Sequence, residues 1–202
     1  ADHIDLYYCH RWDDTTPIEE TLRGLDDLIR MGKVNYIGAS LYAAWQLAHA
    51  NLLAELKGWT PFVVLQSEYN MLKRGVEREI LPYCRAHNVG MVPYYPLAGG
   101  FLTGKYEFGK PPPAGSRGES VKNVQELMIE RNYHVVTKLS AWAKDHGRGV
   151  NELAQAWLLA QPKVCSVITG AKTVEHVTSN VKAAGWHLTS EQLKEIDGIL
   201  KT

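Results

Sequence analysis

A histidine stands at the end of the first apolar segment of the chain. His10 directly follows the strand-like run Ile4 to Cys9. An imidazole can hydrogen-bond a carbonyl oxygen and stabilise the charge that develops on it during a reaction. In parallel sheets covered by helices, functional side chains gather at the carboxyl ends of the strands. His10 is therefore a candidate catalytic residue, and the alternative is an ordinary core histidine.

Two glycine-containing turns have the composition of a phosphate site. The first is Gly99-Gly100-Phe101-Leu102-Thr103-Gly104-Lys105, and the second is Gly170-Ala171-Lys172-Thr173, which opens a predicted helix. Exposed backbone amides and a helix N-terminus attract anions, and the two lysines add positive charge. Glycines also occur in turns for backbone geometry alone. The placement of both turns after the last two predicted strands is what favours a phosphate ligand.

The first turn also fits the GxxxxGK pattern of nucleotide triphosphatases. However, Tyr106 stands where that pattern needs a serine or threonine hydroxyl to ligate magnesium. No apolar strand ends in an aspartate suited to hold the metal. The dinucleotide fingerprint GxGxxG is absent, which argues against a Rossmann domain. A nicotinamide cofactor would have to bind in another way.

Composition narrows the class of protein further. Lysine plus arginine equal aspartate plus glutamate at 22 each, so a nucleic acid is not an expected partner. Cys9, Cys84 and Cys165 show no CxxC spacing, which predicts reduced core thiols, a cytoplasmic location and no metal site. No apolar run is long enough for a membrane span, and the first residues do not show the basic-then-apolar pattern of a secretory leader, so we expect neither a membrane span nor a secretory signal.

Strand-like runs alternate with helical patterns along the chain. The first four runs start about 30 residues apart, which is typical of strand-helix units that cross over to a parallel neighbour. Because the runs are apolar on both faces, helices are expected to cover both sides of the sheet. The five predicted strands are Ile4 to Cys9, Val34 to Ala39, Phe62 to Gln66, Val89 to Tyr94, and Val164 to Ile168.

The predicted helices carry start and stop signals. Thr16-Pro17-Ile18-Glu19 predicts a helix with a threonine N-cap, and Gly32 predicts its end. Two helical segments are expected over Lys122 to His146 and Val150 to Ala160, and a last helix after a capping box, Thr189 to Gln192. Gly99 to Gly118 is expected to form a loop, and residues 1–202 a single domain.

Taken together, the chain resembles the C-terminal part of the aldo-keto reductase family over essentially its whole length. The resemblance implies an α/β fold that is a partial (β/α)8 TIM barrel, containing strands 4 to 8 with their helices and lacking the first three units. It also implies reduction of aldehydes or ketones with NADPH bound across the carboxyl ends of the strands. The segments that carry it are Asp5 to His10, Gly32 to Ser40, Gln66 with Glu68-Tyr69-Asn70, Tyr94 to Leu97, Leu102 to Tyr106, and Gly170-Ala171 with Asn180.

The resemblance assigns roles at the reacting end of the cofactor. It implies that His10 hydrogen-bonds the substrate carbonyl. Ser40 and Gln66 would bind the nicotinamide carboxamide, and Tyr94 would stack on the nicotinamide ring. Arg11 and Trp12, together with the loop from Lys105 to Gly118, are predicted walls of the substrate pocket.

It also assigns roles along the rest of the cofactor. The backbone of Leu97, Gly99 and Leu102, with Lys105, would line the pyrophosphate channel. Lys172 would face the adenosine 2′-phosphate, and Asn180 would meet the adenine. Tyr95, Pro96, Gly170 and His176 complete the predicted cofactor site.

The chain departs from the family pattern at several positions. Leu41 replaces the usual asparagine after the carboxamide-binding serine, which removes one hydrogen bond to the cofactor. His176 and Ser179 replace a glutamine and a glutamate near the adenine. Lys172 supplies a point charge where an arginine or serine is frequent, so NADPH is favoured over NADH by charge alone.

The family's aspartate, proton-donating tyrosine and lysine belong to the first three strand-helix units, which have no counterpart here. We therefore expect the segment to be part of a longer chain and to be inactive alone. Unpaired sheet edges make association into an oligomer possible. A non-catalytic nucleotide-sensing or structural subunit, such as a channel β-subunit, is an alternative from another class. A doubly wound five-stranded α/β domain with an unrelated ligand is a second alternative.

Overall fold

Four strands form one sheet in the order in which they occur in the chain. A computed structural model describes all residues, 1–202. The sheet order is β1-β2-β3-β4, and β1 pairs in parallel with β2, as β2 does with β3. Because this order contains no reversal, it disfavours the doubly wound alternative. The strands are β1 (Ile4–Cys9), β2 (Val34–Ser40), β3 (Val64–Glu68) and β4 (Gly90–Tyr94).

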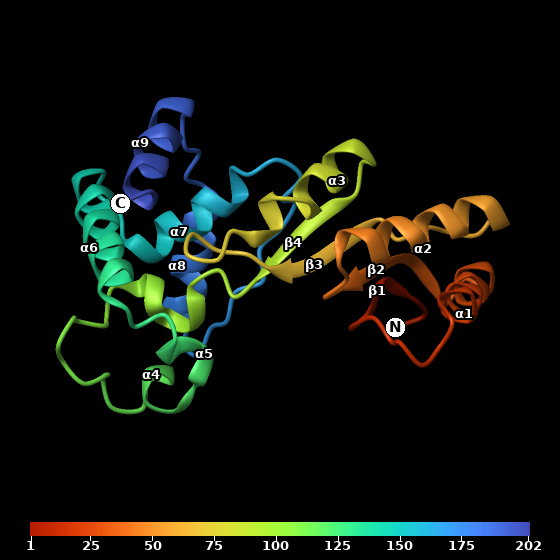
Figure 1. Cartoon of the computed structure of the whole chain (residues 1–202), viewed down its shortest axis with the longest axis horizontal. Coiled ribbons are helices and arrows are strands. Elements are labelled where there is room, and N and C mark those ends of the chain that lie inside the picture. Colours follow the sequence, from red (N-terminus) through yellow and green to blue (C-terminus); the bar gives the residue numbers. More distant parts are fainter. The chain divides into compact units, whose positions relative to one another are not determined.

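Helices connect these strands and make up most of the remaining chain (Figure 1). No helix combines the length and the apolar character needed to cross a membrane. The α-helices are α1 (Ile18–Arg30), α2 (Ala44–Lys57), α3 (Ile80–Ala86), α4 (Arg117–Ser120), α5 (Lys122–Gln125), α6 (Glu130–Asp145), α7 (Val150–Leu159), α8 (Val174–Ala184) and α9 (Ser190–Leu200), and the 3₁₀ helices are η1 (Gly75–Glu77) and η2 (Ala98–Thr103).

The chain divides into two units, and each is described by itself. The first unit contains Ala1–Glu68, Gly75–Val92 and Pro162–Ser166. The second contains Tyr69–Arg74, Pro93–Gln161 and Val167–Thr202. Within β4, Val92 belongs to the first unit and Pro93 to the second.

In the first unit, α1 packs against β2 and α2. Its apolar stripe buries Leu22 and Leu25, as the sequence pattern predicts. The same face carries the buried carboxylate of Asp26, which accepts hydrogen bonds from the backbone nitrogen and the hydroxyl of Thr60 at 2.9 and 3.0 Å. Gly32, with φ of 67°, follows the C-cap and ends the helix, so that prediction is confirmed.

In the second unit, α7 is buried between α6 and α8 (Figure 1). Leu153 and Trp157 are fully buried, and the Trp157 ring lies 5.4 Å from that of Tyr69. The capping box of α9 is confirmed. The backbone nitrogen of Thr189 donates to Gln192 Oε1 at 2.9 Å, and the backbone nitrogen of Gln192 donates to Thr189 Oγ1 at 3.2 Å.

The prediction of a continuous fifth strand, Val164 to Ile168, is wrong. Its segment forms only two isolated parallel bridges, Met91 with Val164 and Tyr94 with Ile168. Met91 and Tyr94 are three residues apart in β4, whereas their partners Val164 and Ile168 are four residues apart. The extra residue interrupts the ladder, as a bulge does.

The predicted start of the first helix is also wrong. The Thr16 hydroxyl donates to Asp13 Oδ2 at 2.7 Å and does not cap α1. Pro17, whose ψ is 130°, is the N-cap, and the helix begins at Ile18.

The helix predicted over Lys122 to His146 is divided. α5 ends at Gln125, and α6 begins at Glu130. Leu127 lies between them, and its carbonyl accepts a hydrogen bond at 2.9 Å from Nδ2 of Asn132, a buried residue in the first turn of α6. This bond occupies a carbonyl that a continuous helix would use for its own backbone.

The prediction that all three cysteines are core residues holds only in part. Cys84 is buried, and burial raises the pKa of its thiol to about 11. Cys9 is half-buried, and Cys165 is exposed. Cys165 belongs to the interrupted segment, where its Sγ donates to the Met91 carbonyl at 3.4 Å.

The first strand is not covered on both faces. Ile4, Leu6 and Tyr7 of β1 are 47%, 37% and 43% exposed. β1 is an edge strand with one neighbour, so helices cover less of it than they cover of β2.

Candidate functional site

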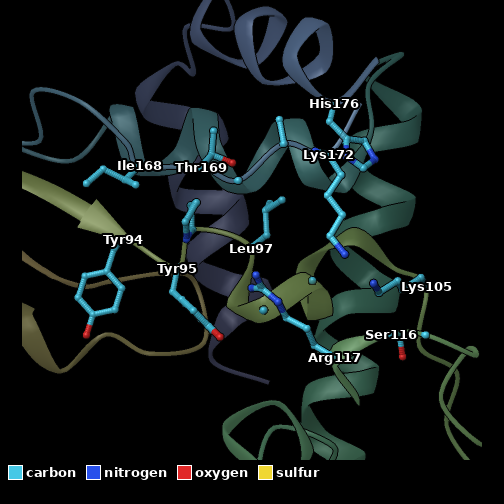
Figure 2. Close-up of a pocket in the computed structure, with 16 residues that line it drawn as sticks. Tyr94, Tyr95, Leu97, Lys105, Ser116, Arg117, Ile168, Thr169, Lys172 and His176 are labelled. Carbon is cyan, nitrogen blue, oxygen red and sulfur yellow. Dashed lines mark hydrogen bonds between the residues drawn. The ribbon is translucent and has the colours of Figure 1, made fainter. Parts of the chain in front are cut away.

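A pocket of about 470 Å³ lies in the second unit, next to the carboxyl end of β4 (Figure 2). Three segments form it: the turn after β4, the loop that leads into α4, and the segment that leads into α8. Its lining residues are Tyr94, Tyr95, Pro96, Leu97, Gly99, Gly100, Lys105, Gly115, Ser116, Arg117, Ile168, Thr169, Gly170, Ala171, Lys172 and His176.

The turn after β4 has an unusual backbone. Tyr95 and Ala98 have φ of 61° and 49°, a region that side chains with a Cβ seldom adopt, and such residues concentrate at functional sites. Gly99 and Gly100 follow with φ of 67° and 101°. A Cβ on Gly100 would lie 3.1 Å from Lys105 Nζ, so the glycine lets the ammonium group approach the backbone.

Positive charge dominates the lining of the pocket. Lys105, Arg117 and Lys172 contribute three cations, and no carboxylate is among the lining residues. In Figure 2 the Lys172 side chain extends toward Lys105, and Arg117 enters from a different segment. The Arg117 guanidinium lies 5.6 Å from the centre of the Tyr95 ring, a cation-π contact. This arrangement favours a ligand with several negative charges.

Two hydroxyl groups in the lining lack partners. Ser116 Oγ and Thr169 Oγ1 are buried and form no hydrogen bond. Most buried polar atoms in proteins are hydrogen-bonded, and an unpaired one costs about 1–3 kcal/mol. Both hydroxyls can serve a polar ligand, so they fit the phosphate-rich cofactor that the sequence suggests.

The N-terminus of α8 follows the last lining segment. Thr173 is its N-cap and accepts a hydrogen bond from the backbone nitrogen of His176 at 3.3 Å. The backbone nitrogen of Lys172 donates to His176 Nδ1, also at 3.3 Å, which fixes the imidazole at the edge of the pocket. The positive end of the helix dipole adds to the attraction for an anion.

Nine of the residues predicted to bind cofactor meet in this pocket. They are Tyr94, Tyr95, Pro96, Leu97, Gly99, Lys105, Gly170, Lys172 and His176.

Two other predicted cofactor residues do not line the pocket. Leu102 is fully buried in η2. Asn180 Oδ1 accepts a hydrogen bond from Gln155 Nε2 at 3.1 Å, which joins α8 to α7.

Sequence reasoning missed the residues that most define the pocket. Ser116, Arg117 and Thr169 were not predicted as cofactor residues, because Ser116 and Arg117 lie in the loop assigned to the substrate pocket and Thr169 precedes the glycine turn. The sequence did contain one signal for this part of the site, an arginine next to a serine within the glycine-rich stretch Gly115 to Gly118. The loop and the turn after β4 line one pocket only because the chain folds, so no local pattern in the sequence indicates that they meet.

Ser40 and Gln66, the predicted carboxamide ligands, are neighbours in the first unit. They are register partners: Ser40 is the last residue of β2, and Gln66 is the middle residue of β3. Ser40 is buried, and Gln66 is half-buried. The next residue, Leu41, has φ of 58°, and its backbone nitrogen donates to the Gln66 carbonyl at 3.0 Å. The two polar residues therefore lie opposite each other on adjacent strands of the sheet.

His10, Arg11 and Trp12 line a separate hollow of about 380 Å³ in the first unit. Trp12 Nε1 donates to Asp14 Oδ1 at 2.8 Å, and its ring meets the Tyr42 ring edge-on at 5.2 Å. His10 itself is exposed, so a substrate can reach its imidazole.

The loop after His10 is tied together by Asp13. Thr15 donates to its carboxylate from both the hydroxyl and the backbone nitrogen, and Thr16 donates from its hydroxyl. These bonds lower the pKa of Asp13 to about 2. The carboxylate is therefore ionised at neutral pH and accepts all three hydrogen bonds in its charged form.

Comparison with known proteins gives a consistent result. Residues 1–201 match the model of the aldo/keto reductase family. Norsolorinic acid reductase A of Aspergillus parasiticus is 34% identical over 98% of this chain and 48% of its own length. The uncharacterized oxidoreductase YrpG of Bacillus subtilis is 36% identical over 98% of this chain and 59% of its own.

A probable voltage-gated potassium channel subunit beta of Arabidopsis thaliana is 39% identical over 90% of this chain and 56% of its own length. The chain thus spans about half the length of the curated relatives it matches.

Proposed function

Because the chain belongs to the aldo/keto reductase family, we propose that it is part of an NADPH-dependent oxidoreductase that reduces aldehydes or ketones to alcohols. The observation that carries the proposal is the pocket with three cations and two buried, unpaired hydroxyls. NADPH has a pyrophosphate and a 2′-phosphate, and these groups match such a lining.

The phosphates of the cofactor would be held by side chains from three segments. Lys105 and Arg117 would bind the pyrophosphate, with hydrogen bonds from Ser116 Oγ and Thr169 Oγ1. Lys172, next to the N-terminus of α8, would face the 2′-phosphate. Backbone nitrogens of the glycine turns would complete the anion site.

Residues at the ends of the strands would serve the reacting groups. When bound, NADPH supplies the hydride that reduces the carbonyl. Ser40 and Gln66 would hydrogen-bond the nicotinamide carboxamide, and Tyr94 would stack on the ring. His10 would donate a hydrogen bond to the substrate carbonyl and stabilise the negative charge that develops on its oxygen.

The proposal includes the fold and the location of the protein. Strand order without a reversal and a helix after each of the first three strands support a portion of a (β/α)8 barrel. Three free cysteines are compatible with the cytoplasm, where thiols remain reduced.

Titration of the full chain with NADPH tests the proposal. We expect saturable binding, monitored by the change in cofactor fluorescence, and weaker binding of NADH, which lacks the 2′-phosphate. Turnover is tested with the longer protein that contains this segment, by loss of absorbance of the reduced nicotinamide after addition of an aromatic aldehyde. Failure to bind NADPH at millimolar concentration would refute the cofactor assignment.

A second function is favoured by one comparison. Two of the relatives, from rice and Arabidopsis, are named as probable potassium channel β subunits. In a nucleotide-sensing or structural subunit, NADPH would bind without rapid turnover. Because this segment alone is expected to be inactive, the comparison is made with the longer protein that contains it: tight binding of NADPH combined with no reduction of a panel of aldehydes and ketones would favour this alternative.

A further inference from the structure

A buried asparagine connects the segment after β3 to the turn after β4. Asn70 is fully buried, and so are its neighbours Tyr69 and Met71. The Asn70 backbone nitrogen donates to the Lys73 carbonyl at 3.3 Å, and the Lys73 nitrogen donates to the Asn70 carbonyl at 3.1 Å. The Tyr69 ring packs against that of Trp157 in α7. Asn70 therefore begins a tight turn that is anchored in the core of the second unit.

Both ends of the Asn70 amide are hydrogen-bonded. Oδ1 accepts from the backbone nitrogens of Leu72 and Lys73 at 3.0 and 2.9 Å. Nδ2 donates to the Tyr95 carbonyl at 3.1 Å. Because a backbone N–H only donates and a carbonyl oxygen only accepts, these partners fix which end of the amide is the donor. The Nδ2 bond leaves the local turn and reaches a residue that lines the cationic pocket.

The residue that Asn70 holds has an unfavourable backbone conformation. Tyr95 has φ of 61°, and such conformations persist where the surrounding structure enforces them. Its carbonyl also accepts a bond from the backbone nitrogen of Ala98 at 3.0 Å, which closes the turn after β4. The bond from Asn70 comes from outside this turn and adds a constraint that the turn itself does not contain.

The same turn contains a backbone arrangement suited to an anion. Leu97 has φ of −99° and ψ of 14°, and Ala98 follows with φ of 49°. A right-handed residue followed by a left-handed one turns successive N–H groups toward one concavity, the nest that binds anions in many proteins. The backbone nitrogens of Leu97 and Gly99 have no acceptor within the protein, and both residues line the pocket. These two N–H groups are therefore free to bind phosphate oxygens.

The Tyr95 ring joins this turn to a cation of the pocket. A Cβ on Gly99 would lie 3.3 Å from Tyr95 Cε1, so the ring lies against the Gly99 backbone. The Arg117 guanidinium lies 5.6 Å from the centre of the same ring (Figure 2). The place of Tyr95 thus affects both the free N–H groups and the arginine beside them.

We propose that Asn70 is a positioning residue: its bond to the Tyr95 carbonyl holds the turn after β4 in the conformation that presents free backbone N–H groups and Arg117 to a pyrophosphate. The proposal rests on the function proposed above, in which this pocket binds the pyrophosphate of NADPH. Asn70 is not among the lining residues, so its effect passes through Tyr95.

Two substitutions remove the bond to Tyr95 and keep the local turn. Asn70→Asp has the same shape and keeps an oxygen acceptor for the two backbone nitrogens, but it lacks the amide donor. Asn70→Ser is uncharged, and its hydroxyl still accepts a bond within the turn but is too short to reach the Tyr95 carbonyl. Asn132→Asp and Asn132→Ser are the matched controls. Asn132 is also buried in the second unit, donates from Nδ2 to a backbone carbonyl at 2.9 Å and does not line the pocket.

Inorganic pyrophosphate and NADPH are the probes, with the full chain labelled with ¹⁵N. Pyrophosphate should shift the backbone amide signals of Leu97 and Gly99. We expect each Asn70 variant to weaken the binding of pyrophosphate and of NADPH by about tenfold, the value of one or two hydrogen bonds to phosphate. The Leu97 and Gly99 signals should also differ from those of the wild type before ligand is added. The Asn132 controls should lose stability without losing affinity, as measured by thermal unfolding and titration.

The wild type provides a test that does not depend on the folding of any variant. When pyrophosphate binds, the side-chain amide signals of Asn70 should shift together with the backbone signals of Leu97 and Gly99, because the bond to Tyr95 joins them. The side-chain amide signals of Asn132 should stay constant. Shifts at Leu97 and Gly99 without a shift at Asn70 would overturn the positioning role.

The outcomes separate the two proposals. If the wild type binds pyrophosphate but not NADPH, the cofactor assignment fails, and the effect of the Asn70 variants on pyrophosphate binding decides the positioning role. If it binds neither, both proposals fail. If the wild type binds NADPH and a folded Asn70 variant binds it as tightly, or the Asn132 controls lose as much affinity, only the positioning role is refuted.

Discussion

The hydroxyls of Ser116 and Thr169 lie buried in the lining of one pocket, and neither forms a hydrogen bond. Ser116 is the N-cap residue of α4, and Thr169 precedes the glycine turn that leads to α8. Buried groups of this kind cost stability when unpaired, so two in one pocket indicate a surface suited to a polar ligand.

The first prediction concerns Thr169→Val, which replaces the unpaired hydroxyl by a methyl group of similar size. Without ligand, we expect the free energy of unfolding to stay constant or to rise by about 1–2 kcal/mol, because a desolvated hydroxyl is removed. Affinity for NADPH should fall by about five- to tenfold through loss of one hydrogen bond to phosphate. Chemical denaturation and cofactor titration measure the two effects. Thr137→Val, at an exposed position of α6, should change neither cofactor affinity nor its salt dependence.

The second prediction concerns the cations of the pocket. We expect Lys105→Ala and Arg117→Ala each to weaken NADPH binding by about tenfold or more, as charge-assisted hydrogen bonds to phosphate are lost. The decline of affinity with added salt should also become less steep, because fewer charges interact with the ligand. Lys138→Ala, on the exposed face of α6, is the control. Equal affinities of Lys138→Ala and Arg117→Ala would remove Arg117 from the site.

Lys172 allows a more selective experiment. Lys172→Ala should weaken NADPH binding and leave NADH binding nearly constant, because the charge is assigned to the 2′-phosphate. Titrations with both nucleotides give the ratio of the affinities for NADPH and NADH directly. A parallel loss of affinity for both would place Lys172 against the pyrophosphate instead.

The third prediction concerns the dependence of stability on pH. Burial alone would raise the pKa of Asp26, but hydrogen bonds from Thr60 and the Arg30 guanidinium outweigh it, so the pKa in the folded protein is lowered. A lowered pKa contributes stability above the unfolded value of about 3.9, and this contribution is lost as pH falls through the folded value. We expect Asp26→Asn to lower the free energy of unfolding at pH 7 by about 1–2 kcal/mol.

The destabilisation caused by Asp26→Asn should begin to shrink below about pH 4, where the carboxyl of the unfolded wild-type chain takes up its proton, and should continue to shrink as pH falls through the lower pKa of the folded carboxyl. Denaturation at several pH values measures it. Asp27→Asn changes an exposed neighbour of the same type and should have little effect at any pH. A loss in Asp26→Asn that is constant from pH 7 to pH 3 would contradict the assignment to charge.

The fourth prediction compares two glycines. Gly38→Ala places a methyl group against Tyr8 and Val64 and should destabilise the protein by about 1–3 kcal/mol, the usual cost of overpacking. Gly24→Ala in α1 meets no atom within 4 Å and should stabilise it by about 0.5–1 kcal/mol through its higher helix propensity. The midpoints of thermal unfolding of the two variants test this prediction, and similar midpoints would refute the close contact at Gly38.

The fifth prediction concerns Leu41, which is exposed and has φ of 58°. Asparagine adopts this left-handed region more readily than leucine does. Leu41→Asn should therefore raise the free energy of unfolding by about 0.5–1 kcal/mol, measured by denaturation. Leu41→Ala, which keeps the unfavourable φ without the amide, should bring no such gain.

Local patterns in the sequence determined much of this protein. The stripe Leu22 and Leu25 predicted a buried helix face, and Thr189 with Gln192 predicted a capping box, because both depend on residues a few positions apart. The composition of the glycine turns that carry Lys105 and Lys172 predicts an anion site in the same way, and residues of both turns line one pocket.

The tertiary structure decided what no local pattern contains. It brought Ser116 and Arg117 into the pocket, exposed Cys165, and interrupted the fifth strand with an extra residue. It also placed the Tyr8 ring over Gly38, which depends on the register of two strands. Such contacts join residues distant in the chain, so their geometry depends on how whole elements pack, whereas periodicity and capping follow from backbone preferences within a single element.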